Sequence, residues 1–264
     1  WLAALATLAG AGAAAAARAQ SAMPKAAPSD QVRPRRLEFA RDHGAHPAFG
    51  IEWWYATGWL ADAATPATPA WGFQLTFFRN RTGLAEDIDS RFAPRQLLFA
   101  HAALTDLRRR RLDHAERIVR WNGAEDAPRG AASLLDTRVH VAGWRLERYG
   151  AGRYRCTLGD SAAGFDWRLA LAPTQPLLLH GDAGTSRKGP HPDNASHYYS
   201  QPQLDVDGEL STDGGRRTAV RGRAWLDHEW SGSLMPEGAV GWDWIGINLD
   251  DGGALMAFRL RDAQ

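Results

Sequence analysis

Short runs of aromatic and β-branched residues, separated by Gly, Pro, Asp and Asn, constrain the fold of this chain more than any other feature. Runs of this length and alternation are typical of strands, and the separators are turn residues. In Trp71–Asn80, the residues Trp71, Phe73, Leu75 and Phe77 alternate with smaller or more polar ones, which predicts a half-buried antiparallel strand. Because no long helical stripe occurs beyond residue 36, the sequence predicts an all-β fold.

Nine runs are expected to be strands. They are Glu52–Ala61, Trp71–Asn80, Gln96–Asp106, Trp144–Tyr149, Tyr154–Leu158, Phe165–Ala172, Thr218–Trp225, Trp242–Leu249 and Ala254–Leu260. The polar segment His180–Gln203 is predicted to be a long loop, and such loops are usually functional or disordered. The last two runs flank the turn Asp250–Gly253 and predict a hairpin. An isolated hairpin is barely stable, so it either completes the preceding sheet or opens a further domain.

The N-terminal region is expected to lie outside the folded part. Residues 1–19 are apolar and alanine-rich and end in Ala17-Arg18-Ala19, the small-x-small form that signal peptidase recognises. They are predicted to be an incomplete export signal, which implies a periplasmic or extracellular location. The alternative is a membrane anchor, which the short length and Arg18 disfavour. Residues 20–36 are rich in Pro, Ala and charge and predict a linker.

Net charge and cysteine content argue against two further features. A formal net charge of +1 argues against nucleic-acid binding, which depends on a basic surface. Cys156 is the single cysteine, so no intrachain disulfide can form. Stability must therefore come from packing, for which twelve tryptophans provide large apolar areas.

Seven segments resemble the family of AttH and carotenoid 1,2-hydratases. They are DHGAHP with EWWYATGWL (Asp42–Leu60), GFQLTFFR (Gly72–Arg79), FAHAALTD (Phe99–Asp106), LLLHGDAGTSRKG (Leu177–Gly189), SHYYSQPQL (Ser196–Leu204), AWLDHEW (Ala224–Trp230) and GWDWIGINLDDG (Gly241–Gly252). The resemblance implies two lipocalin-like barrels in tandem in longer relatives. It therefore implies a lipocalin-like antiparallel β-barrel or sandwich over residues 37–235. Residues 236–264 would then be the opening hairpin of a second, C-terminally truncated barrel.

Asp227-His228-Glu229-Trp230 is the strongest catalytic candidate. If the preceding strand continues, Asp227 and Glu229 lie on one face and His228 and Trp230 on the other, unless a bulge re-aims them. Hydration of a carbon–carbon double bond needs a carboxylic acid of raised pKa, aromatic faces for the cation and a base that holds water. The resemblance implies that His228 and Trp230 are the His-x-Trp pair of the hydratases, with His228 as the water-orienting base.

The resemblance also implies a downstream aspartate as proton donor, in a Tyr-x-Asp element that this sequence does not match. Asp243, between Trp242 and Trp244, is the nearest substitute, with Asp227 and Glu229 as further candidates. An equally weighted alternative is that residues 227–230 form a buried polar network that joins two strands.

The candidate substrate contacts are aromatic and imidazole side chains. They are Trp53, Trp54, Tyr55, His101, His197, Tyr198, Tyr199, Trp242 and Trp244. Core packing is the commoner role for tryptophans such as those in residues 52–55, and residues 197–199 could equally pin the long loop. His43 and His46 lack a third ligand at a zinc-like spacing, so no metal is expected. The implied hydration needs no redox cofactor, so none is expected either.

The sequence therefore predicts an exported lipocalin-like protein that binds an apolar isoprenoid or lipid in its barrel and hydrates a double bond by acid catalysis. The alternative is a non-catalytic lipid carrier or envelope-interaction protein, since apolar burial at about 25 cal/mol per Å² suffices for affinity. The expected partner is an apolar small molecule and not nucleic acid, with peripheral envelope association left open.

Overall fold

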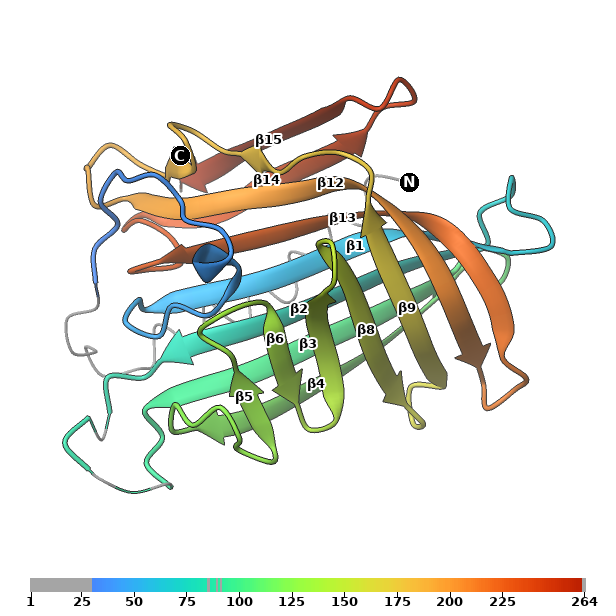
Figure 1. Ribbon diagram of the computed structural model, residues 1–264, viewed down its shortest axis with the longest axis horizontal. Coiled ribbons are helices and arrows are strands. Elements are labelled where there is room, and N and C mark those ends of the chain that lie inside the picture. Colours follow the sequence, from blue (N-terminus) through green and yellow to red (C-terminus); the bar gives the residue numbers. More distant parts are fainter. Residues whose placement is uncertain (1–29, 85, 89, 91, 263–264) are drawn as a thin grey trace.

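A computed structural model describes residues 30–262 apart from residues 85, 89 and 91. Within this part, the chain forms a curled sheet of thirteen strands and a separate two-stranded hairpin (Figure 1). The prediction of an all-β, lipocalin-like fold is confirmed. The expected signal segment 1–19 and residues 20–29 of the expected linker lie outside the described residues. No helix in the described part has the length and apolar character needed to cross a membrane.

A short 3₁₀ helix η1 (Arg41–His43) precedes the strands. These are β1 (Ile51–Asp62), β2 (Trp71–Arg81), β3 (Gln96–Asp106), β4 (Arg111–Trp121), β5 (Gly130–Ala132), β6 (Arg138–Val141), β7 (Trp144–Tyr149), β8 (Arg153–Asp160), β9 (Phe165–Pro173), β10 (Leu178–Leu179), β11 (Thr185–Arg187), β12 (Ala195–Thr212), β13 (Thr218–Ser231), β14 (Ala239–Asn248) and β15 (Ala254–Asp262). The large sheet has the order β4-β3-β2-β1-β13-β12-β9-β8-β7-β6-β5, and β10 and β11 pair with β12.

The sheet curls until its edge strands β4 and β5 meet. A Cβ atom on Gly130 of β5 would lie 2.3 Å from Cγ2 of Val119 on β4, so the two strands approach too closely for a larger residue. Arg117 of β4 donates a hydrogen bond to the carbonyl of Gly159 at 2.7 Å and lies over the ring of Trp144. These contacts close the barrel almost completely.

Apolar side chains fill the interior of the barrel. In β2, Phe73, Leu75 and Phe77 face this core, whereas Gln74 and Thr76 face outward, as the alternation predicts. Five of the tryptophans are among the largest fully buried side chains, namely Trp54, Trp121, Trp144, Trp167 and Trp230. Burial of this apolar area is the main stabilising contribution to the fold.

The prediction of a loop over His180–Gln203 is wrong for its second half. Residues 195–203 begin β12, in which Ser196, His197 and Ser200 are buried. β12 pairs with β13 along one edge and with β9, β10 and β11 along the other. Its polar side chains are buried by contacts with other segments, such as Phe49 against His197 and His180 against Ser200, which explains why the local pattern did not predict a strand. The strands β4, β5 and β6 were also not predicted.

The segment 30–50, blue in Figure 1, packs against the barrel. Val32 and Leu37 are buried, and Arg35 forms an ion pair with Asp42 at 2.7 Å. Within residues 30–36 of the expected linker, Val32 is therefore packed, whereas the other residues are exposed.

The hairpin β14–β15 is confirmed, and among the described residues its strands pair with each other alone. It lies near β12 and β13, at the top of Figure 1. Its assignment to the start of a second barrel stays a prediction.

Candidate functional site

Residues 227–230 lie on β13, whose pairing with β1 is regular, so no bulge re-aims their side chains. Cross-strand neighbours share a face of the sheet. His228 lies opposite the core residue Trp54, and Asp227 lies opposite Tyr55, which borders a pocket. The four residues are therefore split as predicted, with Asp227 and Glu229 facing outward and His228 and Trp230 facing the interior.

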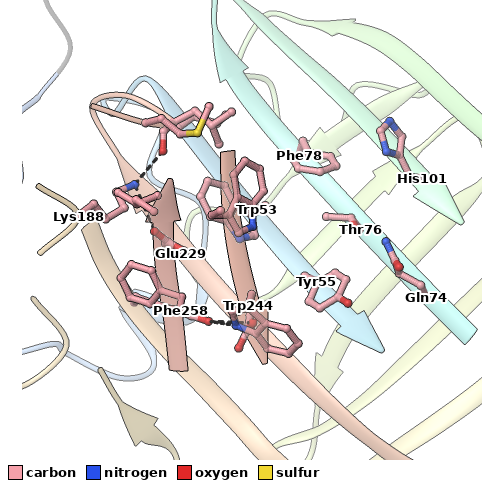
Figure 2. A pocket seen from close by; sticks show the side chains of 17 residues that line it. Trp53, Tyr55, Gln74, Thr76, Phe78, His101, Lys188, Glu229, Trp244 and Phe258 are labelled. Atoms are coloured by element: carbon pink, nitrogen blue, oxygen red, sulfur yellow. Dashed lines mark hydrogen bonds and ion pairs between the residues drawn. The ribbon is translucent and has the colours of Figure 1, made fainter. Parts of the chain in front are cut away.

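A cavity of about 170 Å³ lies where the hairpin meets the outer face of the barrel sheet (Figure 2). Most of its lining is apolar or aromatic: Ile51, Trp53, Tyr55, Phe78, Leu234, Met235, Trp242, Trp244, Phe258 and Leu260. The remaining lining residues are Gln74, Thr76, His101, Lys188, Tyr198, Asp227 and Glu229. The sequence placed the ligand inside the barrel, but packed side chains fill that interior and this pocket lies on the outside.

Asp227 is buried at the base of this pocket. Its carboxylate accepts hydrogen bonds from Tyr198 Oη at 2.9 Å, from Trp225 Nε1 at 2.6 Å and from Ser200 Oγ. Burial raises the pKa of Asp227 to about 7, and the charge of Glu229 acts in the same direction, although the three donors oppose the change. The carboxyl group can therefore hold or release a proton near neutral pH.

Lys188 holds Glu229 in place at one side of the pocket. Its Nζ lies 3.3 Å from Oε1 of Glu229 and donates to Ser231 Oγ at 3.1 Å and to the carbonyl of Leu234 at 3.3 Å. It also lies 5.7 Å from the ring centre of Trp53. These contacts tie the chain that follows β13 to the segment before β12. The sequence did not mark Lys188, because it lies in the segment that was read as a loop.

On the inner face, His228 belongs to a buried network centred on Glu52. Oε1 of Glu52 lies 2.8 Å from His46 Nδ1 and 2.9 Å from His228 Nε2, and Oε2 accepts from Arg79 Nε at 2.9 Å. The other ring nitrogen of His228 lies 3.0 Å from Tyr199 Oη. All five residues are buried. His228 is therefore part of a buried polar network of the kind that the alternative interpretation described, and Trp230 stacks on its member His46.

Opposite charges stabilise this network. Burial alone would raise the pKa of Glu52, but His46, His228 and Arg79 together hold it well below its usual range. The ligand atoms of His46, Glu52 and His228 lie within 4.8 Å of one another, close enough to hold a metal ion. Both oxygens of Glu52 already accept hydrogen bonds, one of them from the cation of Arg79. The geometry is thus that of an ion-paired network, and the expectation of no metal stays a prediction.

A family model described as AttH-like matches residues 30–264. The chain belongs to the AttH-like family. A protein of Nitrosomonas europaea described as a candidate AttH has a solved structure that is 42% identical, with a TM-score of 0.78 over 89% of this chain and 68% of that one. Kievitone hydratase from Nectria haematococca gives a TM-score of 0.55 at 11% identity, over 90% of this chain and 70% of its own. This second likeness shows a shared fold alone.

A comparison with curated proteins gave no match. The predicted family is confirmed, whereas the expected C-terminal truncation has no support in these comparisons.

In this AttH-like chain, six of the predicted substrate contacts line the pocket: Trp53, Tyr55, His101, Tyr198, Trp242 and Trp244. Trp54, His197 and Tyr199 are instead buried away from it. Asp243 does not line the pocket, and its half-exposed carboxylate pairs with Arg259 at 3.1 Å and Arg261 at 3.4 Å. His228 and Asp243 therefore do not contact a ligand in this pocket. The sequence had not singled out Gln74, Thr76, Phe78 or Phe258, whose place in the pocket depends on strand pairing.

Proposed function

We propose that this AttH-like protein binds an apolar, isoprenoid-like molecule in the outer pocket and adds water across one of its carbon–carbon double bonds. The observation that carries the proposal is Asp227, a carboxyl group with a pKa raised to about 7 beside an aromatic cavity. A general acid is most effective when its pKa lies near the working pH. Acid-catalysed hydration of an alkene needs such a group.

In the proposed reaction, Asp227 donates its proton to the less substituted carbon of the double bond. The electron pair of the π bond forms the new C–H bond, which leaves a cation on the neighbouring carbon. The rings of Trp53, Tyr55 and Trp244 border the pocket and stabilise this cation by about 0.5–2 kcal/mol for each contact. Their apolar surface also excludes bulk water from the cation.

Glu229 is the proposed base. It lies two residues from Asp227 on the same face of β13, a backbone spacing of roughly 7 Å. This spacing leaves room for a water molecule, which attacks the cation while Glu229 accepts its proton. Proton return from Glu229 to Asp227 through solvent completes the cycle, so the net change is the addition of one water molecule. The proposal thus assigns the base to Glu229 in place of His228. His228 does not line the pocket and instead helps to position β13 through its hydrogen bond with Glu52.

Export to the periplasm or the extracellular space is part of the proposal and rests on residues 1–19. Their apolar run and the Ala17-Arg18-Ala19 site are the supporting features. Peripheral association with the envelope would place the protein near isoprenoids and lipids. Fractionation of cells that express the protein tests this location.

Incubation with acyclic isoprenoids of the lycopene type in H₂¹⁸O tests the reaction, with mass spectrometry of the products. The expected product is an alcohol that carries one ¹⁸O atom. Asp227→Asn is expected to abolish conversion while the ligand still quenches tryptophan fluorescence. Asp243→Asn is the matched control, because it makes the same change at an exposed aspartate outside the pocket.

Unchanged conversion by Asp227→Asn would overturn the role of this residue as the acid. Binding without conversion by the unmodified protein would instead support the alternative function, a non-catalytic carrier of the same class of ligand.

A further inference from the structure

A row of cross-strand neighbours runs along the outer face of the barrel sheet beneath the pocket. His101 on β3 pairs with Thr76 on β2, Thr76 pairs with Tyr55 on β1, and Tyr55 pairs with Asp227 on β13. All four side chains line the pocket. Because adjacent strands lie about 4.8 Å apart, His101 and Asp227 are separated by roughly 14 Å along this row.

The end of the row near His101 is polar, and the side chains of Gln74 and Thr76 there have no hydrogen-bond partner among the described residues. Figure 2 shows Gln74, Thr76 and His101 on β2 and β3, across the pocket from Trp244 and Phe258 on the hairpin. Three side chains that can donate and accept hydrogen bonds therefore border an otherwise apolar cavity.

The charges around this end favour an uncharged group. The nearest ion-pair partner of His101 is Glu116, 3.8 Å away, and its carboxylate repels an anion. Burial lowers the pKa of His101, so its imidazole is a neutral donor and acceptor near neutral pH. Lys188 lies across the pocket and is already engaged by Glu229 and Ser231. An acidic head group would thus meet repulsion here and no free cation.

We propose that Gln74, Thr76 and His101 form a polar subsite that binds a hydroxyl or carbonyl group at one end of an otherwise apolar ligand. A ligand without that group leaves the polar atoms of Gln74 and Thr76 without a hydrogen-bond partner on binding, which costs affinity. This inference deepens the proposed function and rests on it in one respect, the placement of the reacting double bond at Asp227. It adds that the preferred substrate carries its polar group roughly 14 Å from that bond.

Binding of farnesol, compared with the hydrocarbon in which a methyl group replaces its CH₂OH group, tests the subsite. Dissociation constants come from quenching of tryptophan fluorescence. The unmodified protein is expected to bind farnesol about tenfold more tightly than the hydrocarbon. The double variant Thr76→Val/His101→Phe is expected to bind both probes equally, with its affinity for the hydrocarbon retained.

Thr105→Val is the matched control. Thr105 lies on the same outer face of β3 as His101, opposite Gly72, and does not line the pocket. This variant is expected to keep the preference for farnesol. Thermal unfolding checks that each variant folds, and Gln74→Leu, at a partly exposed position, provides a second test if the double variant does not.

The possible outcomes distinguish a failure of the polar subsite from a failure of the proposed hydration at Asp227. A preference for farnesol without hydration supports the subsite and overturns the reaction at Asp227. Equal affinities of the unmodified protein for farnesol and the hydrocarbon overturn the subsite and leave the proposed reaction untouched. Tighter binding of farnesoic acid than of farnesol would overturn the assignment of an uncharged head group.

Discussion

The two faces of β13 put neighbouring residues of one short motif into opposite environments. On the outer face, Asp227 and Glu229 border a cavity, and burial keeps the pKa of Asp227 raised. On the inner face, His228 and Trp230 are fully buried, and Glu52 is stabilised as an anion by its partners. The comparison teaches that a catalytic-looking motif can divide, residue by residue, into a half that lines a cavity and a half that is packed in the interior.

The largest expected effect belongs to the inner face. Glu52→Gln removes the anion that pairs with the fully buried guanidinium of Arg79, which leaves an uncompensated charge and is expected to reduce the free energy of unfolding by about 3–5 kcal/mol. Denaturant unfolding measures this loss. The control is Asp205→Asn, which breaks an exposed pair with Arg223 at 2.9 Å and is expected to cost less than about 1 kcal/mol. A loss no larger than that of the control would contradict a structural role for the network.

A second prediction concerns how the free energy of unfolding depends on pH through Asp227 on the outer face. The pKa of Asp227 is raised in the folded state from 3.8 to about 7, so the folded protein holds this proton more tightly than the unfolded chain does. The resulting stability is fully present below about pH 4 and is lost as the pH rises to about 7. Relative to Asp227→Asn, the unmodified protein is expected to lose on the order of 4 kcal/mol between pH 4 and pH 8. Unfolding of both proteins by denaturant across this range measures the difference, and a difference independent of pH would contradict the raised pKa.

The smallest expected effect on stability is that of His228→Gln, which tests whether the inner face influences the groups in the pocket. His228→Gln weakens the buried hydrogen bonds to Glu52 and Tyr199 and is expected to reduce the free energy of unfolding by about 2 kcal/mol. Because His228 does not line the pocket, the midpoint of the pH profile of the proposed conversion should be the same as in the unmodified protein. Conversion rates of both proteins, measured across pH at a temperature below their unfolding transitions, provide the check. A shifted midpoint would mean that His228 acts on the reacting groups.

Strands with one packed and one exposed face were predictable because alternation is a local signal. The bounds of β3 and β7 match those expected from the sequence. β12 was missed because Ser196, His197 and Ser200 are buried by segments that no local pattern reveals. β4 was missed for a different reason: most of its residues are at least partly exposed, and its sequence is rich in charge.

The residue types of the site were also predictable, but their partners were not. Asp227, Glu229 and Tyr55 were candidates from the sequence, and the structure brings them to one pocket. Thr76 and Lys188 join them through strand register and through the path of the chain before β12. Strand register and chain path determine which side chains lie next to one another on a face of the sheet. Neither can be derived from a single sequence.

The attachment of the β14–β15 hairpin has a consequence for how this fold can diversify. Its described links to the barrel run through side chains, such as Trp244 Nε1 to Tyr198 Oη at 3.0 Å and Asn248 Oδ1 to the amide of Gln203 at 2.9 Å. None of the backbone ladders of the barrel includes a described residue of the hairpin. Substitutions in the hairpin can therefore change the shape of the cavity while the strand pairing of the barrel stays the same, so cavity shape and folding stability can change separately.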